Sequence, residues 1–347
     1  MEIAGRKIGP DQPPYIVAEI SGNHNGELNR ALELISAAKT AGADAVKIQT
    51  FTPDSLTIDT DREEFKIKSG KWRGLTPYQI YTQTQTPREW HKQLFDHARN
   101  IGITLFSSPF SPDDVKFLEQ FDPPAYKIAS NEIHDIGLLE TVRDTGKPVI
   151  ISMGVDHMKN CRVPFDQSIP LYCIPEYPAT QFNFATLEAI KTLYRIGGYN
   201  IGFSDHSLGT LAAIVAVSLG ACIVEKHLTL DRNDGGMDAH FSSEPDEFEK
   251  LVIDCRAAWG MLGEVKYPGD DLPANVFTRQ FWTVREIKAG EVLTPDNVRS
   301  IRAPQGMGIR ADMPVYGYIA VKDIGRHEPV TDACLTAYYG GAMQAVS

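Results

Sequence analysis

One stretch of this 347-residue chain combines many groups that could do chemistry: VEKHLTLDRNDGGMDAHFS, residues 224–242. It follows directly on an apolar segment that is bounded by glycine. Glu225 and His227 have the same parity, so in a β-strand they point to one face while Lys226 points to the other. A glycine-containing loop with three aspartates and His240 comes next. The stretch therefore predicts a strand that ends at the rim of a polar site.

A second histidine, His206, ends the segment IGFSDHS that directly precedes the one ending in His227. Neighbouring strands lie about 4.8 Å apart, so both imidazoles could meet one divalent ion. Two nitrogen ligands leave coordination positions open, which suits Mn²⁺, Co²⁺ or Fe²⁺ about as well as Zn²⁺. A single histidine of this kind is more often a hydrogen-bonded packing residue, but a pair at strand ends favours the metal.

Two lysines, Lys47 and Lys127, lie within apolar, strand-like segments, where a lysine must reach solvent or meet an anion. Together with nearby hydroxyls they could hold a phosphate and a carboxylate. The alternative is an internal ion pair with Glu19 or Glu132, and the residues alone leave both open. Asn23, in the turn SGNHNG, is equally a turn former or a ligand contact.

The elements that must position these groups are eight short β-rich segments separated by helical stretches. This alternation predicts an α/β fold, a (β/α)8 TIM barrel, in which reactive groups gather at the C-terminal ends of the strands. The segments are YIVAEIS (15–21), AVKIQTF (45–51), TLFSSPF (104–110), AYKIAS (125–130), PVIISMG (148–154), IPLYCIP (169–175), IGFSDHS (201–207) and CIVEKHL (222–228). Helices are expected over 28–42, 87–102, 208–221 and 244–263, each ending near a glycine.

The later part of the chain departs from this regular pattern. Only a short polar stretch, residues 156–168, separates the fifth and sixth strands, so the fifth helix is expected to be missing or very short. The barrel is predicted over 1–263 and a linker over 264–278. Residues 279–347 predict a small β-rich module, in which REIKAGEVLTPDNV and KDIGRHEPVTDACL form an internal repeat.

Bulk composition narrows the class of protein. The hydrophobic content of 42% can fill a large core, and the net charge of −11 argues against a nucleic-acid partner. No apolar run long enough to cross a membrane and no secretory leader is seen, so we expect a cytoplasmic protein without a membrane partner. The five cysteines form no CxxC pair, which suits buried thiols in a reducing compartment.

The motifs taken together resemble the sialic acid synthase family, over nearly the whole chain and in order. They are AEISGNHNG, GADAVKIQTF, TPREWHKQLFDHA, FSSPF, YKIASNEI, KPVIISMG, GFSDHSLG, GACIVEKHLTLDR and the tail module. The resemblance implies a transferase that condenses phosphoenolpyruvate with an amino sugar, and a tail module of the antifreeze-like (SAF) type. The stretches 52–74, 173–179 and 229–248 are most similar to the branch that makes pseudaminic acid from 2,4-diacetamido-2,4,6-trideoxy-L-altrose.

Family membership would also imply roles for the residues at the strand ends. His206 and His227 would hold a divalent metal, first of all Mn²⁺ with Mg²⁺ or Co²⁺ as alternatives, which polarises the open-chain sugar carbonyl. The phosphoenolpyruvate site would consist of Lys47, Ser108, Lys127, Ser130, Ser152 and Ser204. The catalytic residues would be Glu19, Lys47, Lys127, Glu132 and Glu225, with the glutamates as acid–base groups. The sugar would meet Asn23, Asp238 and Arg302.

Arg302, in SIRAPQG, resembles a tail-module arginine that family members insert into the partner subunit's site, which implies a domain-swapped homodimer. The ordinary alternative is a solvated surface arginine. Two positions depart from the family pattern. Pro175 replaces a phosphoenolpyruvate contact and can donate no hydrogen bond, and Ala303 separates Arg302 from the proline that usually follows it. The rival hypotheses are a synthase for N-acetylneuraminic or legionaminic acid, and an inactive sugar-binding or scaffold homologue.

Overall fold

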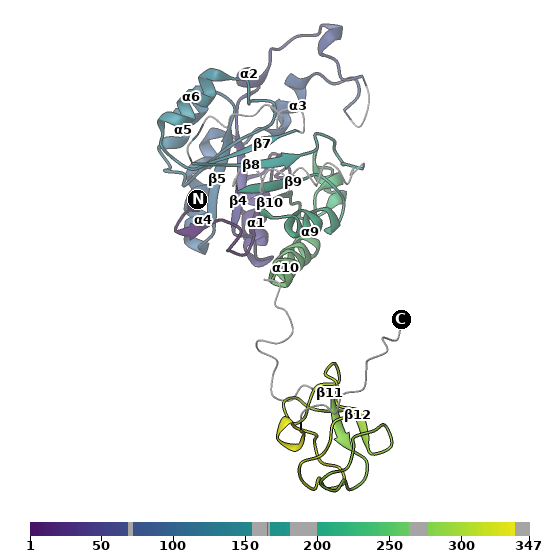
Figure 1. Cartoon of the computed structure of the whole chain (residues 1–347). Helices are drawn as coiled ribbons and strands as arrows, with labels where there is room; N and C mark the ends of the chain where they lie inside the picture. The colour runs from purple at the N-terminus through teal and green to yellow at the C-terminus, as the bar shows by residue number, and fades with distance from the viewer. Residues whose placement is uncertain (69–71, 155–164, 166, 181–199, 264–276, 337–347) are drawn as a thin grey trace. The chain divides into compact units, whose positions relative to one another are not determined.

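Eight parallel strands close into a barrel, as the sequence predicts (Figure 1). The computed structural model describes residues 1–68, 72–154, 165, 167–180, 200–263 and 277–336, and the chain divides into two units, residues 1–263 and 264–347. Each strand pairs with the next along the chain, and the last pairs with the first to close the ring. The strands are β3 (Tyr15–Glu19), β4 (Ala45–Thr50), β5 (Thr104–Pro109), β6 (Tyr126–Ile128), β7 (Val149–Met153), β8 (Ser168–Cys173), β9 (Ile201–Asp205) and β10 (Ala221–His227).

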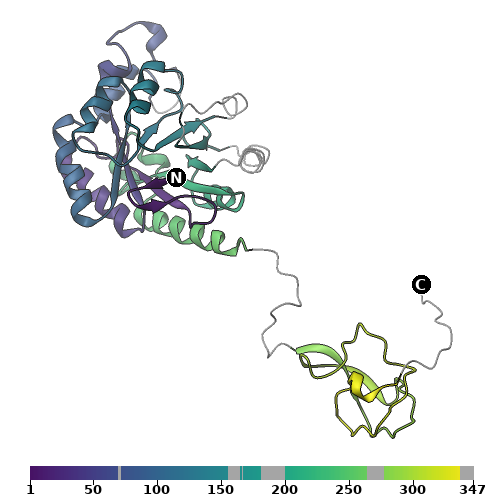
Figure 2. The same ribbon diagram turned by 60° about the vertical axis from the view of Figure 1, so that its left-hand side comes forward.

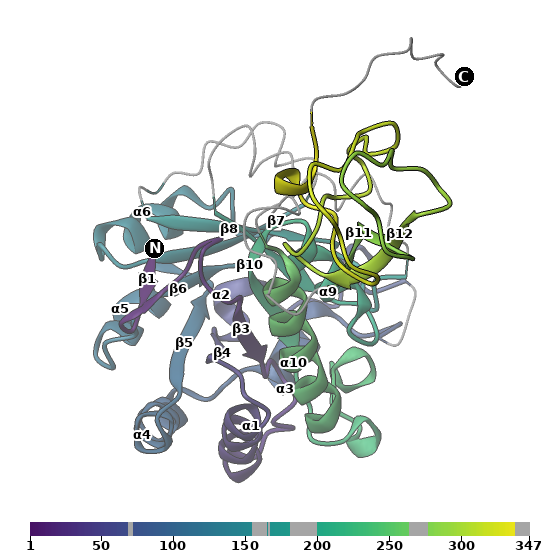
Figure 3. The ribbon, with the colours of Figure 1, turned by 60° about the horizontal axis from the view of Figure 1, so that its bottom comes forward.

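Helices cover the outside of the barrel (Figures 2 and 3). They are α1 (Leu28–Thr40), η2 (Arg88–Trp90), α4 (His91–Ile101), α5 (Pro112–Glu119), α6 (Ile136–Asp144), α9 (Leu211–Ser218) and α10 (Pro245–Met261). The helix predicted over 208–221 is shorter than expected, while α4 ends at Gly102 in the left-handed conformation, as predicted. The stretch 156–168, where the fifth helix is expected to be missing or very short, lies largely outside the described residues. No helix in the described ranges has both the length and the apolar character needed to span a lipid bilayer.

An additional segment lies between β4 and η2 and was not foreseen from the sequence. It contains α2 (Pro53–Leu56), η1 (Glu63–Phe65) and α3 (Pro77–Thr84). Proline follows a threonine N-cap at the start of both helices, and each of these threonines accepts a backbone N–H in a capping box. Gly22 anchors the segment, since a Cβ at Gly22 would lie 2.8 Å from Thr84. Helix α3 therefore packs directly on the turn that follows β3.

The barrel interior changes from apolar to polar along the strands. Alternate residues of the strands form one buried cluster in its N-terminal half, and the hairpin of β1 (Glu2–Ile3) and β2 (Arg6–Lys7) adds Ile3 and Ile8 to it. Packing there is tight at Gly202, where a Cβ would lie 2.3 Å from Leu171 Cδ2 and 2.8 Å from the Ile223 carbonyl oxygen. The site lies at the opposite, C-terminal end, close to the short helices η3 (Arg232–Asp234) and η4 (Ala239–Phe241).

The second unit is built on β11 (Phe277–Thr283) and β12 (Val298–Pro304), which pair antiparallel along their whole length, with η5 (Asp332–Cys334) near its end. β11 begins within the stretch predicted as linker. The predicted repeat is borne out: Gly290 and His327 occupy equivalent positions and have positive φ angles of 88° and 65°. Ile287 and Ile324, also equivalent, exchange backbone hydrogen bonds of 2.9 and 2.8 Å, so the two copies pair with each other.

Candidate active site

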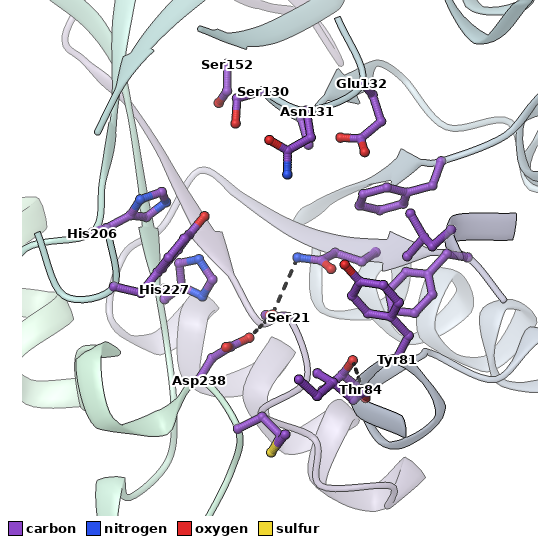
Figure 4. Close-up of a pocket in the computed structure, with 18 of the residues that line it drawn as sticks. Ser21, Tyr81, Thr84, Ser130, Asn131, Glu132, Ser152, His206, His227 and Asp238 are labelled. Carbon is purple, nitrogen blue, oxygen red and sulfur yellow. Dashed lines mark hydrogen bonds between the residues drawn. The ribbon is translucent and has the colours of Figure 1, made fainter. Parts of the chain in front are cut away.

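A cavity of about 310 Å³ opens at the C-terminal ends of the barrel strands (Figure 4). It brings together most of the predicted site residues, which come from five strands and from the loops that follow them. The predicted residues that line it are Lys47, Lys127, Ser130, Glu132, Ser152, Ser204, His206, Glu225, His227 and Asp238. The predicted parity of β10 is confirmed, since Glu225 and His227 line the cavity and Lys226 does not.

Four buried charged groups, Glu19, Lys47, Glu225 and Lys127, form a chain of contacts, and all of them except Glu19 line the cavity. Lys47 Nζ lies 2.5 Å from Glu19 Oε2 and 3.4 Å from Glu225 Oε1. Lys127 Nζ donates to the same Glu225 oxygen at 3.4 Å, and Ser204 Oγ donates to it at 3.3 Å. The alternative of an internal ion pair is therefore realised in part. Lys47 pairs with Glu19 as that alternative predicts, Glu225 is a partner that both lysines share, and Glu132 pairs with neither.

Burial and the neighbouring charges shift the pKa values of these four groups in different directions. Burial raises the pKa of Glu19, and the Lys47 ammonium offsets this only in part. Burial acts the same way on Glu225, but Lys127 and Lys47 hold its pKa below the ordinary value. Burial lowers the pKa of Lys127, whereas the carboxylates of Glu19 and Glu225 outweigh burial at Lys47 and raise its pKa to about 12. Lys47 is therefore firmly charged, whereas the charge on Lys127 depends on the Glu225 carboxylate.

The two histidines lie side by side, with their ring centroids 5.6 Å apart. His206 donates from Nδ1 to the Ile174 carbonyl oxygen at 2.9 Å, which leaves the lone pair on Nε2. His227 Nδ1 is buried without a hydrogen-bond partner in the described structure. Burial lowers the pKa of His206 to about 4 and that of His227 well below its usual value, so both rings are neutral, the form that binds metals.

These two imidazoles could form a divalent-cation site that is open to water and substrate. Among the described residues they do not form a closed structural site, in which protein side chains occupy every coordination position. Within the described ranges no group of three or more His, Cys, Asp or Glu side chains surrounds a common point. A cation held by two ring nitrogens would keep positions for water and for substrate oxygen. The ring of Tyr177, whose centroid lies 4.2 Å from that of His206, covers one side of the pair.

Several polar atoms of the cavity are buried and have no partner in the described structure. Ser152 Oγ and Glu132 Oε2 belong to residues that line it, and Ser108 Oγ is fully buried on β5. Ser108 does not line the cavity itself, but it pairs in register with Gln49, which does. Because an unpaired buried polar atom is unfavourable, such atoms indicate a place where a ligand is received.

The three predicted sugar contacts differ in their positions. Asp238 lines the cavity and accepts a hydrogen bond from Ser21 Oγ. Asn23 is fully buried and does not line the cavity. Its side-chain amide donates to the Leu228 carbonyl oxygen at 2.8 Å and to Ser242 Oγ at 2.9 Å, so it joins the turn after β3 to the loop after β10, and this geometry does not place it at the sugar. Arg302 is exposed on β12 of the second unit and stays a prediction.

Other residues of the cavity were given no role from the sequence. Ser21, Gln49 and Cys173 line it, and the parity of their strands could have revealed the last two, since Gln49 follows Lys47 by two positions and Cys173 ends β8. The rest of the lining comes largely from the additional segment after β4. No periodic pattern in the sequence signals that contribution, because the segment has little regular structure.

The two departures from the family pattern have a structural account. Pro175 is exposed and does not line the cavity, whereas Cys173 and Tyr177 on either side of it do. Ala303 is buried within β12 and its carbonyl oxygen accepts from Gln280 Nε2 at 3.1 Å, so it extends the strand that carries Arg302.

A further buried ion pair lies on the outer face of the same strands. Lys226 Nζ donates to Asp205 Oδ2 at 2.8 Å and to the Ser207 carbonyl oxygen at 2.6 Å. Asp205 Oδ1 in turn accepts from the backbone N–H of Ser207 at 2.9 Å. These contacts fix both chain neighbours of His206 to β10.

Comparison with known proteins agrees with this geometry. The sequence profile of the NeuB family matches residues 34–267, and that of the SAF domain matches residues 265–336. A pseudaminic acid synthase from Campylobacter jejuni is 41% identical over 324 residues, which cover 90% of this chain and 94% of the relative. One from Helicobacter pylori is 35% identical over 331 residues, covering 92% and 97%.

A solved structure is similar as well. It is the N-acetylneuraminic acid synthetase from Leptospira borgpetersenii in complex with citrate, with a TM-score of 0.68 and 31% sequence identity. The match covers 78% of this chain and 92% of the solved one.

Proposed function

Because the chain belongs to the NeuB family and carries a SAF domain, we propose that it condenses phosphoenolpyruvate with 2,4-diacetamido-2,4,6-trideoxy-L-altrose to give pseudaminic acid and phosphate. The relatives from Campylobacter jejuni and Helicobacter pylori bear the name of this activity. The observation that supports it most directly is the composition of one cavity, which holds two buried lysines, unpartnered polar atoms and two adjacent imidazoles.

Phosphoenolpyruvate is the substrate that the lysines fit. Its phosphate and carboxylate would bind Lys47 and Lys127, whose ion pairs among the described residues are with Glu19 and Glu225. Ser130 and Ser152 line the same cavity and offer hydroxyl donors. In this arrangement Glu225 positions both ammonium groups, because its one oxygen lies 3.4 Å from each of them.

The reaction needs an electrophile more than a base, since phosphoenolpyruvate is already an enol ester. Its C3 forms a bond to the sugar aldehyde carbon, water adds at C2, and phosphate leaves by C–O cleavage from the resulting tetrahedral carbon. A proton must reach the aldehyde oxygen and another must leave the water. Glu19 is suited to the proton transfers because burial raises its pKa and it contacts Lys47 directly. Glu132, at the cavity wall, is a second candidate.

His206 and His227 would hold a divalent cation, for which Mn²⁺ is our first choice. Such a cation supplies Lewis-acid polarisation of the sugar carbonyl when it is bound. In His206→Ala or His227→Ala we expect no detectable product, and excess Mn²⁺ should not restore it. Calorimetric titration with Mn²⁺ alone should show loss of binding in the same variants. Full activity or unchanged binding in either variant would refute the assignment.

A domain-swapped homodimer is proposed on the exposed position of Arg302 and on the family resemblance. Subunit mixing can test it. His206→Ala should remove cation binding in the variant's own barrel, and Arg302→Ala should impair sugar use in the partner's site. If the arm is swapped, a mixed dimer has one doubly damaged site and one intact site, so the mixture should exceed the sum of the separate activities at low sugar concentration. A strictly additive mixture argues for an unswapped arm.

The product assay decides the substrate. Purified protein is incubated with phosphoenolpyruvate, Mn²⁺ and one sugar at a time, and products are identified by mass spectrometry. Pseudaminic acid from the diacetamido sugar supports the proposal, whereas preferential use of N-acetylmannosamine would defeat it. Ligand-induced stabilisation without phosphate release from any sugar would favour the inactive homologue.

A further inference from the structure

One side of the cavity is apolar and aromatic, in contrast to the polar side that carries the lysines and histidines. We call it the aromatic wall; it consists of Phe51, Leu56, Ile67, Trp72, Tyr81 and Phe110. Its centre is the buried ring of Phe51, which packs edge-on against Tyr81 and Phe110 with centroid distances of 5.7 and 5.4 Å. Figure 4 shows Tyr81 across the cavity from His206 and His227.

The aromatic wall comes mostly from the additional segment between β4 and η2, not from the barrel strands that carry the chemistry. The segment is attached to the turn after β3 by the Gly22–Thr84 contact, and the capping boxes at Thr52 and Thr76 fix where α2 and α3 begin. It is therefore a preformed surface that can set selectivity without altering the barrel. Within this wall, Trp72 Nε1 is buried and has no hydrogen-bond partner in the described structure.

From this division of the cavity we infer that the aromatic wall selects the sugar. It contacts the end of the sugar opposite to the aldehyde and binds the C6 methyl group and an N-acyl group. The inference rests on the proposed function. With the aldehyde carbon at His206 and His227, the open-chain sugar extends toward the opposite side of the cavity. A methyl group there is buried against Phe51 and Tyr81, and the acyl carbonyl accepts the Trp72 N–H.

The physical basis is the asymmetry between a methyl group and a hydroxymethyl group at this surface. A hydroxyl packed against the ring faces of Phe51 and Tyr81 loses its bonds to water and gains no partner from those faces. Apolar pockets discriminate by roughly 10- to 100-fold at such a position, because one added hydroxyl can be only partly excluded. The wall should therefore separate 6-deoxy sugars from 6-hydroxy sugars to about this extent.

The test uses two sugars that differ only at C6, namely 2,4-diacetamido-2,4,6-trideoxy-L-altrose and its 6-hydroxy counterpart. For each, kcat/KM is measured by phosphate release at saturating phosphoenolpyruvate, together with the KM for phosphoenolpyruvate. The wild-type enzyme should prefer the deoxy sugar by roughly 10-fold or more. Tyr81→Ala should reduce this preference to less than about 3-fold and leave the KM for phosphoenolpyruvate unchanged. Tyr78→Ala is the matched control, because Tyr78 lies on the same helix and does not line the cavity.

A second variant separates the two parts of the inference and remains useful if Tyr81→Ala folds poorly. Trp72→Phe keeps an aromatic side chain but removes the N–H, so the KM for both sugars should rise while the preference for the deoxy sugar stays. The inference is overturned if the wild-type enzyme does not discriminate the two sugars, or if Tyr78→Ala erases the preference as Tyr81→Ala does. Exclusive use of N-acetylmannosamine by the wild-type enzyme would instead mark the failure of the proposed function.

Discussion

The ion pair of Lys226 and Asp205 gives the sharpest prediction about the framework of the site. Both side chains are essentially inaccessible to solvent, with exposed fractions of 1% and 0%, and Nζ lies 2.8 Å from Oδ2. In Lys226→Met the carboxylate of Asp205 stays buried, and the donors that remain to it within the described ranges are the hydroxyl and backbone N–H of Ser207. Removing one partner of a buried pair destabilises a protein by about 3–5 kcal/mol.

Urea unfolding followed by circular dichroism at 222 nm can measure this effect. The α-helices of the described ranges all lie between Leu28 and Met261, so the helical signal reports on the barrel unit. With an m-value of about 3 kcal/mol per molar urea, a loss of 3–5 kcal/mol lowers the midpoint by roughly 1–2 M. The double variant Asp205→Leu with Lys226→Met removes both charges and should recover at least half of the loss, because no unpaired charge remains.

The control is an exposed pair of the same charge types, Lys92 and Asp96, whose Nζ–Oδ2 distance is 2.6 Å. Both members are largely in contact with solvent, so Lys92→Ala should shift the midpoint far less than Lys226→Met. Equal shifts in the two variants would show that burial does not decide the strength of these pairs here. A double variant as unstable as Lys226→Met alone would show that the loss is one of packing and not of charge.

Four further outcomes are expected. Glu225→Gln should move the alkaline limb of kcat/KM for phosphoenolpyruvate to lower pH, because burial lowers the pKa of Lys127 and the Glu225 carboxylate opposes that effect; a limb that moves upward would exclude Lys127 as the group. Arg302→Ala should raise the KM for the sugar about 10-fold while the KM for phosphoenolpyruvate stays constant, in steady-state assays that vary each substrate in turn. Gly202→Ala should lower the unfolding midpoint strongly, because its Cβ would lie 2.3 Å from Leu171 Cδ2; an unchanged midpoint would mean that the interior relaxes freely. Chelation with EDTA should abolish product formation and added Mn²⁺ should restore it, whereas undiminished turnover after dialysis would count against the cation.

The sequence by itself determined the features that depend on local pattern. The eight strands, their order and the side to which Glu225, His227 and Lys226 point all follow from alternation and parity, which are properties of a few consecutive residues. The polar ends of the strands and the repeat in the second unit could be predicted for the same reason.

Only the tertiary structure decided which of these groups meet. Barrel closure and strand register place Glu225, and not Glu132, between Lys47 and Lys127, and they bury Asn23 against Leu228 and Ser242. The aromatic wall arises from a segment with little regular structure that folds over the end of the barrel. Contacts between residues far apart in the chain depend on how the barrel closes. No local pattern in the sequence specifies which of these residues come into contact.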